Sequence, residues 1–425
     1  MITLLIVADD FTGALDTGVQ LAGCGAPTRV VTDPEFSPAN AAGAEVLVID
    51  AETRHLPPSQ AGAIVEGIVR RAVEQKVPYI YKKTDSALRG NVGAELGALL
   101  AASGEKALPF LPAYPQIDRC TRGGVHYIEG RPVAESVFGI DPFEPVRHSD
   151  IAGLIGAQSG VPVHSLPADA PAPEGQGIYV YDASSLADLE RAGQTLAAAG
   201  RLHISAGCAG FGAVLPQLLG LGRAQQPPKP RLDPRLLVVC GSVNPITVAQ
   251  LDAAEEAGFA RLRLTPRQKL EPGYWNTPEG EADRARIEAL LQANPRVLLD
   301  SNDAGGNGPT ADYAAGLGCG LEEMRVRIAS SIGDLVAGLL HSPAVGTLLM
   351  TGGDTLLQVM RCAGVRELEP LCELEKGVVL ARCTYRGCTR HVITKSGGFG
   401  QAALLTDLAA RLEAQAEENR NRSER

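Results

Sequence analysis

The stretch ITLLIVADDFTG, residues 2–13, decides the fold. Its aliphatic residues 4–8 have the composition of a buried strand, and Thr12 and Gly13 are typical of a turn into a helix. Two adjacent aspartates, Asp9 and Asp10, stand between strand and helix. Capping of the helix explains one carboxylate but does not need two. We interpret Asp9 as serving the turn and helix start, and Asp10 as reaching a ligand.

The same unit of aliphatic run, polar turn and helical spacing recurs along the chain, which indicates a largely parallel sheet. In the first half we expect strands at 4–8, 46–50, 79–82, 107–111 and 178–181, with helices near 14–23, 59–75, 91–102 and 185–199.

The sequence GRAQQPPKPRLDP, residues 222–234, contains four prolines and predicts an extended spacer. We therefore expect domains at 1–222 and 236–416, a Pro-rich linker at 223–235 and a charged tail at 417–425, where a fraying helix gives way to a disordered end. In the second domain we expect strands at 236–240, 261–264, 297–299, 347–350, 378–383 and 391–394, with helices from about residue 245 and at 279–293, 322–340, 355–363 and 400–416.

Composition excludes several classes of protein. The net charge of −10 and pI near 5.3 argue against nucleic acid as a partner. We find neither a signal peptide nor a run of about 18 apolar residues, so we expect a cytoplasmic protein with no membrane partner. The nine cysteines form no CxxC pair, and Cys383, Cys388 and His391 lack a second ligand pair, so we predict no protein-bound metal.

Polar clusters follow the expected strands of the first half, where parallel sheets bind ligands. Arg54 lies just beyond the second strand, and the stretch KKTDSALRG, residues 82–90, beyond the third. A solvated loop could carry such residues. Guanidinium groups bind carboxylates, however, and Asp and Ser bind hydroxyls, so the combination favours a sugar acid. The residues concerned are Lys82, Lys83, Thr84, Asp85, Ser86 and Arg89.

Glycine-rich turns follow three expected strands of the second half. They are Gly241-Ser242, the segment 352–355 and the segment 395–400. Any one could be a plain tight connection, but three together favour a cradle of backbone N–H groups for nucleotide phosphates. No GK[ST] sequence occurs, so a Walker-type loop is absent. A GxGxxA match at 398–403 lacks a following strand for the ribose-binding acid, and we interpret it as coincidental.

These observations predict a two-domain α/β protein. Each domain would be a largely parallel or mixed sheet flanked by helices, with the active site in the cleft between them. A sugar-acid pocket in one domain and a phosphate cradle in the other suggest a kinase that closes around both substrates.

The sequence resembles that of the four-carbon acid sugar kinase family from residue 1 to about residue 410. The stretches that carry the resemblance are ADDFTGALD, TRHL, KKTDSALRGNVGAE, LPAYP, DPFEPVRHSD, CGSVNPIT, TGGDT and KSGGFG, in the family's order. The resemblance implies an N-terminal domain that binds a tetronate, a C-terminal domain that binds ATP, and phosphorylation of the terminal 4-hydroxyl. The stretch DTGVQLA is more similar to the D-threonate kinases than to the 3-oxo-tetronate kinases.

Residue by residue, the resemblance assigns one set of positions to the sugar acid and another to ATP. The sugar-acid set is Asp10, Arg54, Lys83, Thr84, Asp85 and Ser86, to which we add Arg89; the ATP set is Ser242, Gly352, Gly353, Asp354, Thr355, Gly397 and Gly398. Family members commonly have a Gly-Arg pair after LPAYP. This chain reads QIDRCTRGG there, so Arg119 or Arg122 replaces it.

Our mechanistic hypothesis gives each charged residue a role. Arg54, helped by Lys83 or Arg89, would fix the substrate carboxylate, while Asp10 and Asp85 bind hydroxyls. Mg²⁺ would bridge the ATP phosphates. The catalytic candidates are Asp10, Asp85 and Asp354, which could orient or deprotonate the attacking hydroxyl, and Lys395, which could neutralise the transferred phosphoryl group.

Other substrates and functions stay open. D-erythronate, L-threonate and 3-oxo-tetronate are alternative substrates to D-threonate. A nicotinamide-dependent sugar-acid dehydrogenase and a non-catalytic sensor are alternatives of other classes, and we also expect that the protein could form a homodimer.

Overall fold

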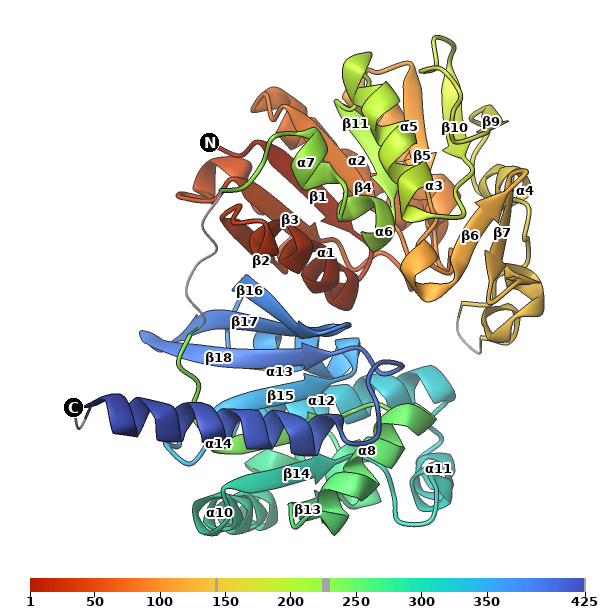
Figure 1. Ribbon diagram of the computed structural model, residues 1–425. Helices are drawn as coiled ribbons and strands as arrows, with labels where there is room; N and C mark the ends of the chain where they lie inside the picture. Colours follow the sequence, from red (N-terminus) through yellow and green to blue (C-terminus); the bar gives the residue numbers. More distant parts are fainter. Residues whose placement is uncertain (142–143, 224–229, 424–425) are drawn as a thin grey trace. The chain divides into compact units, whose positions relative to one another are not determined.

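The computed structural model describes residues 1–141, 144–223 and 230–423 (Figure 1). The chain divides into two compact units, unit 1 with residues 1–227 and unit 2 with residues 228–425. Each unit is an α/β structure, which confirms the predicted fold class of sheets flanked by helices. The predicted linker 223–235 includes residues 224–229, which lie outside the described residues, so the domain bounds stay a prediction.

Unit 1 is built on an eight-stranded sheet in the order β2-β3-β1-β4-β11-β5-β10-β9, and every paired strand is parallel. Sequence patterns had not predicted β2, β9 and β11. The strands are β1 Leu4–Ala8, β2 Thr28–Val31, β3 Val46–Asp50, β4 Tyr79–Lys83, β5 Ala107–Leu111, β9 Val163–Leu166, β10 Gly177–Tyr181 and β11 Ile204–Gly207.

Helices cover the sheet of unit 1. Leu5 and Val7 of β1 share a buried core with residues of α2 and α3, and the alternation of side chains turns Leu4 and Ile6 to the other face. The helices are α1 Phe11–Gly23, α2 Pro58–Glu74, α3 Val92–Ser103, α4 Ile151–Gly156, α5 Leu186–Ala198, α6 Ala209–Gly212 and α7 Leu215–Leu218. A small antiparallel sheet also belongs to this unit, with β6 Arg119–Arg122, β7 Val125–Ile128 and β8 Arg131–Pro132.

Unit 2 has a mixed sheet in the order β13-β14-β12-β15-β18-β17-β16. The pairs from β13 to β18 are parallel, whereas β17 and β16 extend the sheet in antiparallel fashion. The strand β16 was not among the strands expected from the sequence. The strands are β12 Leu236–Cys240, β13 Ala260–Arg263, β14 Arg296–Asp300, β15 Thr347–Thr351, β16 Glu367–Glu375, β17 Val378–Tyr385 and β18 Cys388–Lys395.

Helices α8 and α14 share one core with the strands of unit 2: Leu251 of α8 and Leu405 and Leu408 of α14 are buried with Val238 and Leu349. The helices are α8 Pro245–Glu256, α9 Pro266–Leu270, α10 Pro278–Ala293, α11 Gly308–Gly316, α12 Leu321–Leu339, α13 Gly353–Cys362 and α14 Leu404–Ser423. Helix α14 continues to Ser423, through most of the segment 417–425 in which the sequence predicted a fraying helix and a charged tail.

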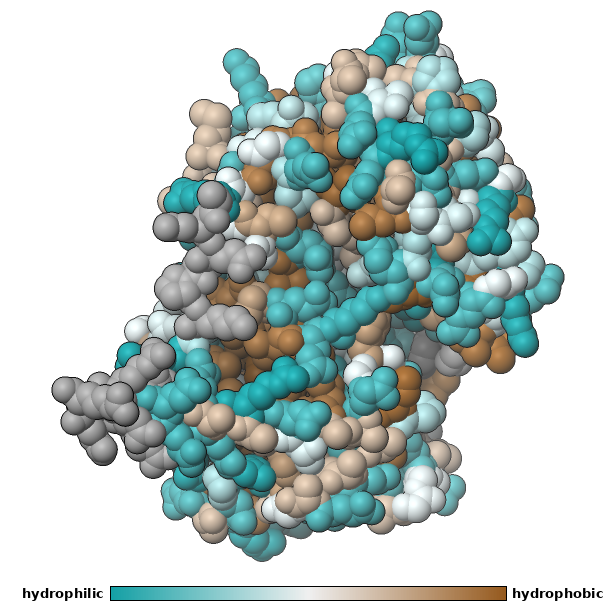
Figure 2. Space-filling view, viewed as in Figure 1, coloured by the Kyte–Doolittle hydropathy of each residue, from teal (hydrophilic) through white to brown (hydrophobic). Residues whose placement is uncertain are grey.

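Hydrophilic and hydrophobic side chains are interspersed over the visible face of each unit in Figure 2. Among the residues that the structure describes, no helix is both long enough and apolar enough to cross a membrane.

Candidate functional site

Strand register brings the polar clusters of unit 1 to one edge of its sheet. Ala8 of β1 pairs with Asp50 of β3 and with Lys83 of β4, and Lys83 pairs with Gly207 of β11. The strands are parallel, so the segments that follow them emerge side by side at the carboxyl edge. The segments at Asp9 and at Arg54, and the loop 84–89, therefore meet, as the sequence predicted.

Arg54 holds both aspartates of the opening stretch. Its Nε and Nη2 lie 2.8 Å from Asp9 Oδ2, while Nη1 and Nη2 lie 2.9 and 2.7 Å from the two carboxylate oxygens of Asp10. Burial would lower the pKa of Arg54, but the carboxylates of Asp10 and Asp9 outweigh it and raise the pKa. This guanidinium group is thus already engaged with protein carboxylates.

The predicted division of labour between the two aspartates is wrong in one respect. Asp10, not Asp9, caps α1: its Oδ1 accepts the N–H of Gly13 at 3.1 Å. The side chain of Asp9 is 4% exposed and that of Asp10 24% exposed, so Asp10 is still the more accessible carboxylate. The backbone of Asp10 is extended, as the N-cap position requires. The N-cap of α1 is therefore Asp10 and not the preceding residue, Asp9, as predicted.

Asp85 organises the loop after β4. Its carboxylate accepts from Arg89 Nε at 2.8 Å and Nη2 at 3.1 Å, and from the backbone N–H groups of Ala87 and Arg89. Burial would raise the pKa of Asp85, yet Arg89 and Arg54 hold it well below its usual range. Thr84 turns away from this network, because its Oγ1 donates to Gly207 O at 3.3 Å.

The adjacent lysines of β4 have different surroundings because successive strand residues point to opposite faces. Lys82 is fully buried and pairs with Glu95 of α3 at 3.1 Å. Lys83 Nζ donates to Thr84 O at 2.9 Å and forms no ion pair within the described ranges. A Cβ built on Gly13 would lie 2.7 Å from Lys83 Nζ and 2.5 Å from Asp10 Oδ1, so both groups rest against this glycine.

Arg119 joins the cluster, whereas Arg122 does not. Arg119 Nη1 donates to Ser86 Oγ, and its guanidinium carbon lies 5.1 Å from the centre of the Phe138 ring. Arg89 lies 5.2 Å from the same ring. Arg122 instead donates to Ser184. Of the two replacements that the sequence left open, the structure brings Arg119 to the predicted sugar-acid residues.

Two residues of unit 1 were missed by sequence reasoning. Asn91 Nδ2 donates to the backbone oxygens of Thr53 and Leu56, each at 2.8 Å, and so ties the Arg54 segment to the start of α3. Glu95 neutralises Lys82. The charged Glu95 among the apolar residues of α3 was a usable signal, since a carboxylate on a buried helix face needs a partner.

Register also assembles one edge in unit 2. Cys240 of β12 pairs with Asp300 of β14 and Thr351 of β15, and Thr351 pairs with Lys395 of β18. Three of these strands lead into the predicted glycine turns. The fourth, β14, leads into residues 301–308, which sequence analysis had not singled out.

The three glycine turns are in close contact. A Cβ on Gly241 would lie 1.7 Å from Thr355 Oγ1, and a Cβ on Gly397 would lie 2.7 Å from Ser242 Oγ. Gly352 has a φ of 103° and lies against Gly241, since a Cβ there would be 3.4 Å from the Gly241 carbonyl carbon. Glycine is required by the close contact at Gly241 and by the positive φ at Gly352. The turns thus form one compact group at the sheet edge.

Lys395 lies beneath this group. Its Nζ donates to Thr247 Oγ1 at 3.0 Å and to the backbone oxygens of Ser396 and Gly397, each at 3.1 Å. Burial lowers the pKa of Lys395 to about 8. The ammonium group therefore braces the 395–397 turn and places a positive charge next to it.

Asp354 and Ser242 have partners that the sequence did not reveal. Arg325 of α12 donates to Asp354 Oδ2, and the Asp354 side chain is 44% exposed. Asn302, which follows β14, donates to Ser242 O at 3.1 Å and to Asp300 Oδ1 at 2.8 Å. The loop after β14 therefore supports the Ser242 turn.

The GxGxxA match at 398–403 lies in the connection between β18 and α14, and α14 begins only at Leu404. In a dinucleotide fingerprint the pattern opens the helix itself, so this arrangement does not fit one. Within the described parts of the chain, no group of three His, Cys, Asp or Glu side chains could hold a metal ion.

Comparison with known proteins gives matches to both units. Residues 4–215 match a model of a sugar-binding N-terminal domain, and residues 237–405 match a model of a nucleotide-binding C-terminal domain. The D-threonate kinase of Salmonella typhimurium is 30% identical over 95% of this chain and 97% of its own length. The chain belongs to the four-carbon acid sugar kinase family. It is accordingly an enzyme of the kinase class.

Other relatives in this family carry different substrate names. The D-threonate kinase of Bordetella bronchiseptica is 31% identical over 94% of this chain and 95% of its own, and the D-erythronate kinase of Heliobacterium modesticaldum is 27% identical over 95% of each. A crystal structure from Salmonella typhimurium LT2, described as a tRNA synthase, has a TM-score of 0.78 at 22% identity, covering 97% of this chain and all of that one. At that identity the likeness shows the fold alone.

Proposed function

We propose that this kinase transfers the terminal phosphoryl group of Mg-ATP to the 4-hydroxyl of D-threonate, giving D-threonate 4-phosphate. Two relatives at 30% and 31% identity over nearly the whole chain have that substrate in their names. The sequence of the helix after the first turn favours the same acid. D-erythronate, L-threonate and 3-oxo-tetronate are the competing substrates.

The proposal rests on which cationic side chains of unit 1 are paired with protein carboxylates and which are not. Arg54, Lys82 and Arg89 are each paired with a protein carboxylate. Lys83 and Arg119 form no ion pair with any carboxylate of the described residues, although Lys83 is buried and Arg119 is half-buried. An unpaired buried cation is costly unless a ligand anion compensates it.

We therefore assign the substrate carboxylate to Lys83 and Arg119, and not to Arg54 as first hypothesised. Asp10, which is more exposed than Asp9, would accept the hydrogen bond of a substrate hydroxyl. We propose it as the residue that orients the attacking 4-hydroxyl. Arg54 would hold Asp10 in place, and Asp85 with Arg89 would shape the loop that carries Ser86.

In unit 2, we propose that the three glycine turns bind the phosphates of ATP, using Ser242, residues 352–355 and Gly397 with Gly398. Convergent backbone N–H groups at helix N-termini suit this role. Lys395 would neutralise charge on the transferred group. Mg²⁺ would be bound through the phosphates of ATP. The cytoplasmic location and the homodimer stay predictions.

The test is an ADP-release assay with Mg-ATP and each of the four acids. We expect kcat/KM for D-threonate to exceed that for the other three by about tenfold or more. A higher value for another acid would reject the substrate. Absence of turnover with all four, with ATP still bound, would mean that the acid substrate is none of these tetronates.

A further inference from the structure

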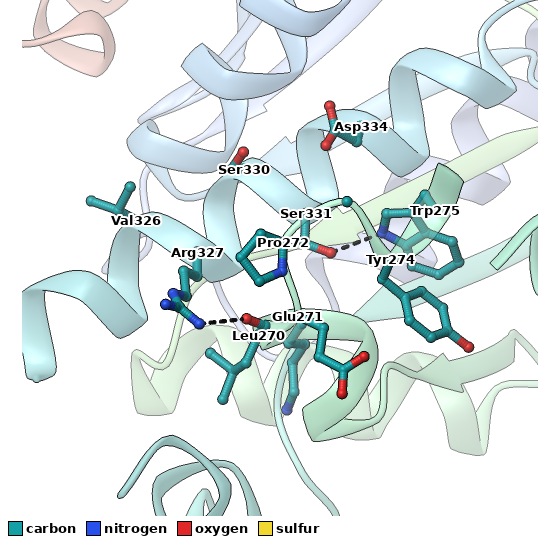
Figure 3. Close-up of a pocket in the computed structure, with 12 residues that line it drawn as sticks. Leu270, Glu271, Pro272, Tyr274, Trp275, Val326, Arg327, Ser330, Ser331 and Asp334 are labelled. Carbon is teal, nitrogen blue, oxygen red and sulfur yellow. Dashed lines mark hydrogen bonds between the residues drawn. The ribbon is translucent and has the colours of Figure 1, made fainter. Parts of the chain in front are cut away.

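A cavity of about 160 Å³ lies in unit 2 between the segment that follows α9 and the helix α12 (Figure 3). Leu270, Pro272 and Val326 give it apolar sides, while Ser330 and Asp334 of α12 add polar groups. None of these residues belongs to the turns assigned to phosphate.

The walls of the cavity are fixed by hydrogen bonds. Trp275 Nε1 donates to Ser331 Oγ at 2.8 Å, and Arg327 Nη1 donates to Leu270 O at 3.1 Å (Figure 3). Trp275 is only 1% exposed, so its ring is part of the wall. The cavity is therefore preformed, as small-molecule sites usually are.

Helix α12 connects the cavity to the Gly352 turn. Arg325 pairs with Asp354 at that turn, and the next residue, Val326, lines the cavity. Ser330 lies one helical turn further along the same helix. The cavity thus begins beside the residue that contacts one predicted phosphate turn.

The opposite wall connects to the Ser242 turn. Lys269 lines the cavity, and its Nζ donates to Ser301 O at 2.8 Å and to Asp303 Oδ1 at 2.6 Å. Between these two residues stands Asn302, which donates to Ser242 O. Two of the three glycine turns are therefore linked to this cavity through short series of contacts, one through Arg325 and Val326 and the other through Asn302 and its neighbours.

The size of the cavity limits what it can hold. Pockets that enclose a whole small ligand have volumes of roughly 300–1,000 Å³, so this one takes only part of a nucleotide. Apolar sides suit the faces of a flat heteroaromatic ring, and the hydroxyl of Ser330 and the carboxylate of Asp334 can accept from an amino group on its edge. We propose that this cavity holds the adenine ring of ATP, an inference that rests on the proposed function.

The natural protein offers a direct probe, because Trp275 is the one tryptophan of the chain. ADP and inorganic tripolyphosphate both carry phosphates, but only ADP carries the base. We expect saturating ADP to change the Trp275 emission, while saturating tripolyphosphate leaves it unchanged. Equal changes with both ligands, or no change with ADP although ADP inhibits, would overturn the assignment.

A variant tests the same cavity by affinity. Ser330→Phe fills it, and Leu317→Phe makes the same kind of change at an exposed position that does not line it. We expect Ser330→Phe to raise KM for ATP about tenfold or more, with kcat and the inhibition constant of tripolyphosphate within about twofold of the parent. Leu317→Phe should match the parent.

An unchanged KM for ATP in folded Ser330→Phe, or a parallel loss of tripolyphosphate binding, contradicts the base site. If the parent enzyme phosphorylates none of the tetronates, the proposed function fails instead. The emission test with ADP would still report on the cavity in that case.

Discussion

Arg54 and Asp9 form a buried ion pair in which Nε and Nη2 each lie 2.8 Å from Asp9 Oδ2. The same guanidinium group binds Asp10, so one arginine joins the loops that follow β1 and β3. Asp9 faces the protein interior and Asp10 is partly open to solvent. The two adjacent carboxylates therefore have separable roles.

Replacing each aspartate by asparagine should separate stability from catalysis. Asp9→Asn removes a buried charge-assisted pair, and we expect the free energy of unfolding to fall by about 1.5–3 kcal/mol. Asp10→Asn keeps an oxygen that can cap α1, so it should lower kcat at least about tenfold with a smaller change in stability. Denaturant unfolding and steady-state kinetics measure the two effects. Equal losses of kcat from both variants would contradict this division.

The two lysines of β4 form a matched pair. We expect Lys83→Met to raise KM for the sugar acid about tenfold or more and to leave KM for ATP unchanged, because it removes the cation assigned to the substrate carboxylate. Lys82→Met leaves Glu95 buried without its partner, and should instead destabilise the fold by about 3–5 kcal/mol. A Lys83→Met enzyme with an unaltered sugar-acid KM would show that the carboxylate binds elsewhere.

A substitution at Gly241 tests the contact between the Ser242 turn and the Thr355 turn. A Cβ at this position would lie 1.7 Å from Thr355 Oγ1, so Gly241→Ala must push the Ser242 and Thr355 turns apart. We expect KM for ATP to rise about tenfold or more, which corresponds to about 1.4 kcal/mol of binding. Gly308→Ala is the control, since a Cβ there meets no atom within 4 Å. If Gly241→Ala binds ATP normally, these turns do not form the phosphate site.

The lowered pKa of Lys395 leads us to expect that kcat/KM for ATP depends on pH. Burial lowers its pKa to about 8, so in the free enzyme the ammonium loses its charge as the pH rises through that value. The kcat/KM for ATP should therefore fall above pH about 8. The unfolded chain keeps this proton to higher pH, so the same group should make the fold more stable as the pH rises above that value. Lys395→Arg stays charged, and its kcat/KM for ATP should keep its value to higher pH. A flat profile for the parent enzyme would argue against a charged Lys395 in ATP binding.

The strands with continuous aliphatic runs were predictable from sequence. For β1, β3, β5 and β12 the predicted bounds equal the observed ones, because a buried parallel strand is apolar on both faces. In contrast, β11 has the sequence ISAG, whose small residues carry little strand signal. The strand β16, with sequence ELEPLCELE, begins with alternating charged and apolar residues, and counting that alternation would have indicated it.

The meeting of the polar segments at one edge of the sheet was predictable, but the contacts of each neighbouring residue were not. Parallel strands bring their carboxyl ends to one edge, so the clusters near Asp10 and Lys83 had to meet there. Which of Lys82 and Lys83 is paired depends on Glu95, a residue of α3 that comes into contact only through packing. The same holds for Arg325 and Asp354, which are 29 residues apart in the chain.

The position of the new phosphate ester tests the central claim most directly. We would incubate the enzyme with Mg-ATP and D-threonate and record the proton-coupled ³¹P spectrum of the product. An ester at the terminal CH₂–O group couples to both protons of that carbon, so the account predicts a triplet together with release of an equal amount of ADP. A doublet would place the phosphate on an inner CH–O group and contradict the account, and so would ADP release without any phosphate ester.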